Sequence, residues 1–358
     1  MSARREYDTA ILVAFAAALQ IAESFIPYPV PGAKLGLANI ATMLALMRFG
    51  PGAAVTVAFL RTIVASLVLG TFLAPPFFLS LTGALGAALL SSLVYVVFVN
   101  AKRPFMSSIG VSVAGSVASI LCQTVVAALF FVKTTALFSI VPYLVIIAVV
   151  TGWVNGYIAA RMISSHRYER FIAVISGAMR PEALSASSKK PAMRPVLSVI
   201  GAFAAAVILA VSDAPLVGAA VAVIFIIYAV VLRVPLRALF RVLRKSILPI
   251  ALFSFAAFLA ANNGAVLAVI GGFIITQEGV SIAVKSAARL FLLSFNAMLL
   301  MRAVKSEDLV AIAVRCVPPI PVVRKHLMPM AHAAALALVA TPHAVAAIRA
   351  EVNKMFSR

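Results

Sequence analysis

Charged residues are scarce in this chain, and acidic residues are the scarcest of them. Only 11% of its 358 residues are charged, with 10 acids against 30 lysines and arginines. A soluble domain has about a quarter of its residues charged, so the composition excludes an ordinary soluble fold. Hydrophobic residues make up 64% of the sequence, and apolar runs of helix length recur along it. These features predict an all-α polytopic membrane protein.

Several chemical signatures are also missing from the sequence. The two cysteines, Cys122 and Cys316, and the four histidines show neither disulfide nor metal-ligand spacing. There is no Gly-x-x-x-x-Gly-Lys-Ser/Thr motif, which excludes ATP binding of the P-loop kind. Asp8, Asp213 and Asp308 are isolated, so the clustered carboxylates of a magnesium–diphosphate site are missing. We therefore predict that the chain is not an enzyme and holds no cofactor or metal.

The basic residues are abundant, and they give the chain a net charge of +20. In a soluble protein this charge would suggest nucleic acid as a partner. Here the basic residues gather in short connections between apolar runs, where they orient the chain in the bilayer. A cytoplasmic N-terminus leaves only Lys34 and Lys133 in the outer connections of the first half. We predict this orientation, with the lipid bilayer and not nucleic acid as partner.

The apolar runs divide the chain into two halves. The first half has runs at residues 9–26, 36–47, 52–69, 78–99, 107–131 and 139–160. A polar, basic stretch rich in serine and proline follows at 166–195 and predicts a cytoplasmic linker. The second half has runs at 196–211, 216–232, 247–259 and 280–300. We predict domains at 1–165 and 196–358, a six-helix bundle and a membrane domain of four to five helices.

Two stretches of the second half are predicted to lie on the cytoplasmic side. The basic residues between 233 and 245 predict an inner loop. The apolar stretch 327–348 precedes a basic tail, which would lie outside if the stretch crossed the membrane. An interfacial or re-entrant helix fits these charges better, although the stretch is long enough to span.

Arg61 is the main candidate for a binding residue. It lies near the middle of an apolar run, and a charge at that depth costs about 2.5–3.5 kcal/mol or more. Glu23, near the end of the first run, is either a carboxylate at headgroup level or a pocket residue paired with Lys34 or Arg61. The alternative for Arg61 is a structural ion pair with Glu23 or a bond to a backbone carbonyl.

Lys34 and several neutral side chains complete the predicted site. Lys34 sits in a loop bent by prolines, and Gly36 leads from this loop into a helix N-terminus, which favours an anion. The alternative for Lys34 is a surface lysine beside lipid phosphates. Neutral hydrogen bonds are predicted from four further residues, each of which alone is commonly a contact between helices. They are Asn39, Thr62, Gln123 and Asn155.

Small residues recur every fourth position on the first run, at Ala10, Ala14, Ala18 and Ala22. In a membrane, this spacing lets another helix approach closely. It predicts either a docking face for the second half or another subunit, or ordinary packing within the first bundle.

The first half resembles the Gx transporter family, also labelled heptaprenyl diphosphate synthase component I. The residues that carry the resemblance are Pro-Gly-Ala-Lys-Leu-Gly-Leu-Ala-Asn at 31–39, Arg61-Thr62, Leu-Gly-Thr-Phe at 69–72 and Leu-Ser-Leu at 79–81. This family is similar to the substrate-binding S components of energy-coupling factor (ECF) transporters. The synthase label has no support in the residues, because a diphosphate-condensing enzyme needs clustered acids.

The second half resembles the transmembrane T component of the same transporters. The residues are Gln-Glu-Gly at 277–279, Arg289, Ser-Glu-Asp-Leu at 306–309, Pro342 and Glu351. The paired Ala-Arg-Gly-type motifs with which T components hold their ATPases are not found.

Together the resemblances imply an ECF-type transport protein of a bacterial plasma membrane. Its substrate-binding and scaffold halves are fused, it takes up a small molecule, and separate ATPase subunits are expected partners. Flavin, quinone-related and prenyl compounds are candidate solutes. The alternative is a non-transport membrane subunit that supports a polyprenyl diphosphate synthase or an electron-transfer system.

Overall fold

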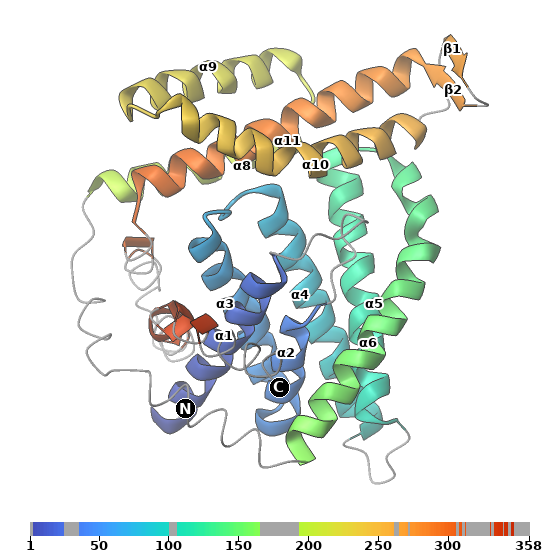
Figure 1. Ribbon diagram of the computed structural model, residues 1–358, viewed down its shortest axis with the longest axis vertical. Coiled ribbons are helices and arrows are strands. Elements are labelled where there is room, and N and C mark those ends of the chain that lie inside the picture. Colours follow the sequence, from blue (N-terminus) through green and yellow to red (C-terminus); the bar gives the residue numbers. More distant parts are fainter. Residues whose placement is uncertain are drawn as a thin grey trace, which may run out of the picture.

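The first half of the chain folds into a bundle of six helices, which run side by side (Figure 1). The computed structural model describes residues 3–24, 36–99, 106–164, 193–260, 265–270 and 273–305, and short stretches at 308–309, 312, 330, 333–338, 340–342 and 345–346. The helices of the first half are α1 (Ala3–Glu23), α2 (Ala38–Phe49), α3 (Pro51–Leu69), α4 (Pro75–Val94), α5 (Ser108–Val126) and α6 (Val141–Ser164). The predicted fold class is thus confirmed.

The ends of these helices follow from proline, glycine and serine. Both α3 and α4 begin with proline, whose missing N–H would have no partner inside the helix anyway. Gly70 ends α3 in the left-handed region at φ 70°, and its N–H bonds back to Leu67. The Ser107 hydroxyl accepts the N–H of Gly110 at the start of α5.

Short helical turns of other types extend three of the six helices. A π-helical turn, η1 (Tyr95–Val99), continues α4, and a second one, η2 (Ala127–Val132), continues α5. A 3₁₀ turn, η3 (Thr135–Ile140), leads into α6. With these extensions the three apolar spans measure 25, 25 and 28 residues, which is long enough to cross a membrane.

Glycine allows α5 and α6 to pack at close range. A Cβ atom added at Gly152 or Gly156 of α6 would lie 2.8 Å from the Cα of Val113 or Ile109 of α5. Side chains are not found that close to a backbone atom, so these two positions on α6 have no room for one. The spacing of four residues is the small-residue pattern typical of helix pairs in membranes.

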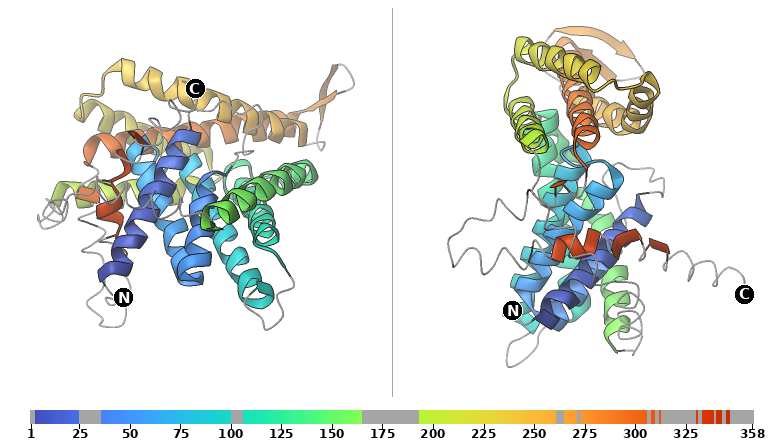
Figure 2. Two further views of the ribbon diagram at one scale, coloured as in Figure 1. Left: turned by 60° about the horizontal axis from the view of Figure 1, so that its bottom comes forward. Right: turned by 90° about the vertical axis from the view of Figure 1, so that its left-hand side faces the viewer.

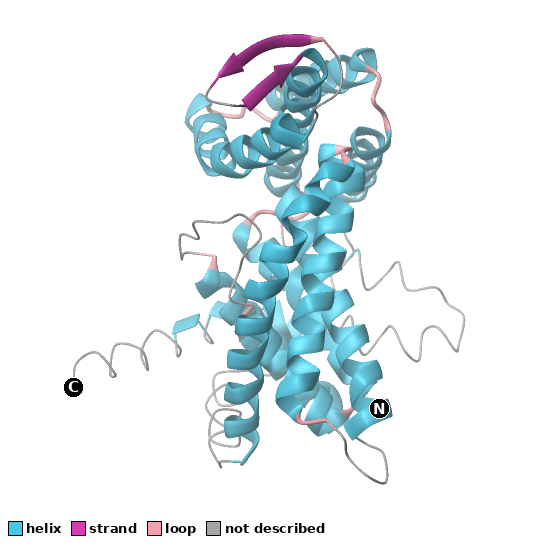
Figure 3. Cartoon of the chain, turned by 90° about the vertical axis from the view of Figure 1, so that its right-hand side faces the viewer, coloured by secondary structure: helices cyan, strands magenta, loops and turns pink. Residues whose placement is uncertain are grey.

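Up to residue 305, the described part of the second half contains four helices and a hairpin (Figures 1 and 3). The helices are α8 (Met193–Val211), α9 (Pro215–Val231), α10 (Leu236–Ala260) and α11 (Gln277–Ala303). An antiparallel hairpin of β1 (Val266–Ile270) and β2 (Phe273–Thr276) connects α10 to α11. The Thr276 hydroxyl then accepts the N–H of Gly279 at 3.1 Å and caps α11. The predicted linker lies outside the described residues except for residues 193–195, which begin α8.

Two predictions for the second half are corrected by this fold. The basic stretch predicted as an inner loop is helical from Leu236 onward, because Leu236, Leu239 and Val242 continue a helical apolar period among the arginines. The hairpin was not predicted at all. Its strands are short apolar runs that periodicity alone does not distinguish from helix.

Helices of the second half cross one end of the first bundle, as Figure 1 shows. α11 contacts α4 and η2, and α10 contacts η3. Among the described residues, six segments are long and apolar enough to cross a membrane: α3, α4 with η1, α5 with η2, α6 with most of η3, α8 and α11. Because α8 and α11 run across the others, the two groups cannot both follow the normal of one flat bilayer.

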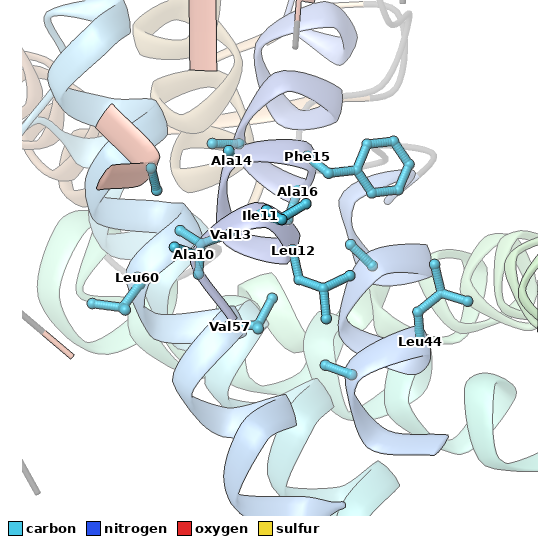
Figure 4. Packing of buried hydrophobic residues seen from close by; sticks show 14 of the residues in the cluster. Ala10, Ile11, Leu12, Val13, Ala14, Phe15, Ala16, Leu44, Val57 and Leu60 are labelled. Carbon is cyan, nitrogen blue, oxygen red and sulfur yellow. The ribbon is translucent and has the colours of Figure 1, made fainter. Parts of the chain in front are cut away.

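Helix α1 lies at the centre of the largest apolar cluster. Figure 4 shows its residues Ala10 to Ala16 among Leu44 of α2 and Val57 and Leu60 of α3. Ala333, Ala337 and Ala340 of the second half belong to the same cluster. Figure 2 likewise shows this C-terminal segment beside α1.

Three of the four alanines of the predicted face, Ala10, Ala14 and Ala18, are fully buried in a cluster that includes the second half, whereas Ala22 is partly exposed and lies outside that cluster. The stretch 327–348 is described only in part, as helix at 333–338 and 340–342. Its placement as an interfacial or re-entrant helix stays a prediction.

Replacing Gly156 with alanine tests the close packing of α5 and α6. We expect Gly156→Ala to lower the free energy of unfolding by about 1–3 kcal/mol, because the new Cβ overlaps the Ile109 backbone. The matched control is Gly201→Ala on α8, where a Cβ meets nothing within 4 Å. Unfolding by SDS in mixed micelles measures both variants. Equal stability of the two would contradict the packing.

Candidate functional site

Arg61 points into the bundle and binds two amide side chains from neighbouring helices. It is 5% exposed, near the middle of α3. Its Nη1 donates to Gln20 Oε1 of α1 at 3.0 Å, and its Nη2 donates to Asn39 Oδ1 of α2 at 2.8 Å. The Nε–H is buried and has no hydrogen-bond partner among the described residues. The guanidinium therefore faces protein and not lipid, and its Nε–H is left as an unused donor.

Glu23 and Gly36 tie the end of α1 to the start of α2. Glu23 is 3% exposed, and its Oε1 accepts the Gly36 N–H at 2.6 Å. The Gly36 carbonyl in turn accepts from Asn155 Nδ2 of α6 at 3.2 Å. Gly36 has φ +69°, and a Cβ there would lie 3.1 Å from the Asn39 amide. Glycine is required here both for its conformation and for space.

These contacts join six polar side chains and the backbone of Gly36 into one group, here called the Arg61 cluster: Gln20, Glu23, Gly36, Asn39, Arg61, Ser80 and Asn155. Gln20 extends it to α4, because its Nε2 donates to Ser80 Oγ at 3.0 Å. The negative charge of Glu23 acts on the positive charge of Arg61. A buried cation with a buried carboxylate nearby and hydrogen bonds on both is tolerated in an apolar interior, whereas either charge alone is costly.

The structure brings four of the seven predicted site residues together. Glu23, Asn39, Arg61 and Asn155 come from four separate helices and lie in the Arg61 cluster. Because Glu23 is buried, its alternative as a water-exposed carboxylate at headgroup level is wrong. Sequence reasoning missed Gln20 and Ser80. Gln20 lies three residues before Glu23 in an apolar helix, so both side chains are on the same helix face. This shared face could have identified Gln20 from the sequence.

The remaining predicted residues lie elsewhere. Thr62 is fully buried, and its hydroxyl bonds within α3 to the Ala58 carbonyl at 3.0 Å. Gln123 of α5 donates to Ser119 of its own helix at 2.9 Å and packs against Gly83 of α4. The structure thus gives both side chains a local role, apart from the Arg61 cluster. Lys34 and most of its loop lie outside the described residues, so its role stays a prediction.

A small cavity with both polar and apolar lining residues adjoins the Arg61 cluster. It measures about 10 Å³, room for roughly one water molecule. Asn39 lines it, together with hydroxyl, apolar and glycine residues of α2, α3, α4 and α5: Thr42, Met43, Leu46, Ala54, Ala87, Ser91, Ser112, Gly115 and Ser116. The buried Thr42 hydroxyl has no partner among the described residues. Polar groups thus continue from Arg61 through Asn39 into the bundle.

Comparison with known families separates the same two halves. Residues 12–162 match the family described as heptaprenyl diphosphate synthase component I, and residues 186–343 match the family described as cobalt transport protein. The chain is a fusion of an S-component-like half and a T-component-like half. The predicted resemblance is confirmed. The Arg61 cluster lies within the S-like half, and α8 to α11 lie within the T-like half.

No curated protein and no solved structure matches the chain. The words synthase and cobalt come from the descriptions of the two matched families, and they are properties of those families. Among the residues that the structure describes, no group of three or more His, Cys, Asp or Glu side chains gathers as a metal site would require.

Removing the Arg61 charge should destabilise the fold through Glu23. We expect Arg61→Leu to cost about 3–5 kcal/mol of unfolding free energy, because it leaves a carboxylate buried without a cation. The double variant Arg61→Leu with Glu23→Gln should recover part of this loss. Unfolding in SDS mixed micelles gives the measurement.

The control for this experiment is Ser66→Ala, a buried α3 residue whose hydroxyl bonds within its own helix. It should change the unfolding free energy by no more than about 1 kcal/mol. If Arg61→Leu and Ser66→Ala lower the unfolding free energy by the same amount, the Arg61 charge does not stabilise the buried Glu23 carboxylate.

Proposed function

We propose that this chain is the membrane-embedded part of an ECF-type transporter, with the solute-binding half and the scaffold half in one polypeptide. The observation that carries the proposal is the Arg61 cluster, a buried cation surrounded by amides inside a half that resembles substrate-binding components. The T-like half supports it, because T components hold the binding component against the ATPases. In this proposal the S-like half binds the solute and the T-like half positions it.

The charges of the S-like half favour a small solute with an anionic group. Glu23 and Arg61 balance one another, so Lys34 would give the site a net positive charge. The Nε–H of Arg61 is an unused donor, and Asn39, which accepts a hydrogen bond from Arg61, also lines the small cavity. A planar guanidinium pairs well with a carboxylate or phosphate through two parallel bonds. Because Gln20 and Asn39 already hold Arg61, little ordering is needed when the solute binds.

In this mechanism the anionic group of the solute takes a place now filled by an amide oxygen. It would exchange with the oxygen of Gln20 or Asn39 on the guanidinium, so that no buried donor is left unpaired. The loop that carries Lys34 joins α1 to α2, whose facing ends Glu23 and Gly36 hold together. Flavin, quinone-related and prenyl compounds stay candidate solutes, and ATPase subunits at the cytoplasmic face stay the proposed source of energy.

Native mass spectrometry of the detergent-purified chain tests the solute site. We expect the wild type to retain a small molecule, and Arg61→Lys to lose at least about nine-tenths of it. Lysine keeps the charge but cannot form two parallel bonds, a loss that corresponds to a tenfold or larger weakening. Ser66→Ala should retain the molecule. Undiminished retention by Arg61→Lys and Arg61→Leu would remove the site from the proposal.

Purification from the native membrane tests the transport assignment separately. Tagged chain should recover ATPase subunits in mild detergent. Recovery of a prenyl synthase or a flavoprotein in their place would favour the non-transport alternative, whatever the solute result.

A further inference from the structure

The end of η2, in the S-like half, is capped by a helix of the T-like half. The last carbonyls of a helix have no partner within it and carry partial negative charge. Here Arg289 Nη1 of α11 donates to the Phe131 carbonyl at 3.0 Å. Ser286 Oγ, nearly one turn earlier on α11, donates to the Val132 carbonyl at 3.2 Å. Two side chains of one half therefore satisfy the backbone of the other.

An ion cluster completes this contact. Asp213, in the turn between α8 and α9, accepts from Arg289 Nη2 at 2.6 Å and pairs with Lys133 Nζ at 2.8 Å. Lys133 directly follows η2 and also donates to the Val211 carbonyl at 2.8 Å. Two cations thus face one carboxylate and the negative end of η2, so the charges nearly balance. Each half supplies charged groups that the other half needs.

The inner side of the contact is shielded from solvent. The Arg289 side chain is only 8% exposed, whereas that of Asp213 is 63% exposed. Phe131 and Val132 are buried in one apolar cluster with Leu290 and Leu293 of α11. Losing Arg289 would therefore leave the Phe131 carbonyl without this donor in a buried place, which costs more than losing an exposed ion pair.

A chain of direct contacts leads from this contact to the Arg61 cluster. The Phe131 ring lies beside Phe78 of α4, with ring centroids 6.3 Å apart. Two residues further along α4, Ser80 binds Gln20, which in turn binds Arg61. α4 therefore contacts the cluster through one side chain and the end of η2 through another. Spatial continuity allows coupling but does not prove it, so the coupling has to be measured.

We propose that Lys133, Asp213, Ser286 and Arg289, with the end of η2, form a latch that docks the S-like half on the T-like half and is coupled through α4 to the Arg61 cluster. The latch would transmit a change at the cluster to the second half. The proposal goes beyond solute binding and holds whichever solute the S-like half takes.

Hydrogen–deuterium exchange of the full chain in detergent tests the latch. We expect Asp213→Asn and Arg289→Gln to speed exchange in peptides covering residues 127–137 by about tenfold, because a hydrogen bond to a charged group is lost. Lys285→Met, an exposed cation one turn away on α11, is the matched control and should change nothing. Unchanged exchange in Arg289→Gln, with the fold retained, would overturn the latch.

A second experiment tests the coupling without any solute. Gln20→Leu breaks the bonds from Arg61 and to Ser80, and should also speed exchange at 127–137. Combined with Arg289→Gln, its effect should be clearly less than additive, as expected for coupled sites. Thr56→Val, whose hydroxyl bonds within α3, should leave this region unchanged. Additive effects, or no effect of Gln20→Leu on residues 127–137, would overturn the coupling.

The latch should also weaken in acid. The hydrogen bond from Lys133, with the added charges of Lys133 and Arg289, holds the pKa of Asp213 below its usual range. A carboxyl with a lowered pKa in the folded state stabilises that state above its ordinary pKa of about 3.9. The stabilisation is lost as the pH falls through the lowered pKa.

The pH dependence is measured as a difference between two proteins. Wild type should unfold at a higher temperature than Asp213→Asn at pH 7, and the difference should shrink as the pH falls below about 3.9 and through the lowered pKa of Asp213. A difference that stays constant over this range would mean that the Asp213 charge does not contribute to the latch.

Discussion

The S-like half is arranged around a guanidinium that cannot leave its apolar surroundings. Arg61 lies too far from either end of α3 for its side chain to reach water easily, so it needs polar partners at its own depth. Gln20, Asn39 and the charge of Glu23 supply them from α1 and α2. Each partner then needs further hydrogen bonds of its own, and these extend to Ser80 and Gly36. One buried cation thus determines how five helices approach one another at this level of the bundle.

The two halves are joined by two different kinds of contact. Around α1, alanines of both halves pack without polar groups, and small side chains let the backbones approach. At the end of η2 the contact is ionic. Lys133 of the S-like half pairs there with Asp213 of the T-like half, and Arg289 binds both Asp213 and the Phe131 carbonyl. Apolar packing tolerates sliding, whereas charge pairs with defined donors fix one position. The ionic contact is therefore the part that defines how the crossing helices are placed.

Much of the site could be predicted because charge in an apolar helix is rare. Arg61 and Glu23 stood out for that reason. Asn39 and Asn155 were predicted only as neutral polar residues of the same bundle, and the structure brings all four together. Gln20 and Ser80 did not stand out, since neutral polar residues are common in membrane helices. Thr62 and Gln123 are also neutral polar residues of apolar helices, but each forms its hydrogen bond within its own helix. Which neutral side chain faces a cluster depends on helix rotation, and the sequence of one helix does not define it.

The sequence alone determined that the chain lies in a membrane, that it has two halves and that most of it is helical. Hydrophobicity, charge asymmetry and helix length are properties of each segment by itself, and they do not depend on how the segments pack against one another. The tertiary structure decided that the second half crosses the end of the first. It also placed Arg289 and Asp213 beside Lys133, 156 and 80 positions away in the chain. Pairings over such distances depend on the packing of many helices at once, so no single segment of sequence encodes them.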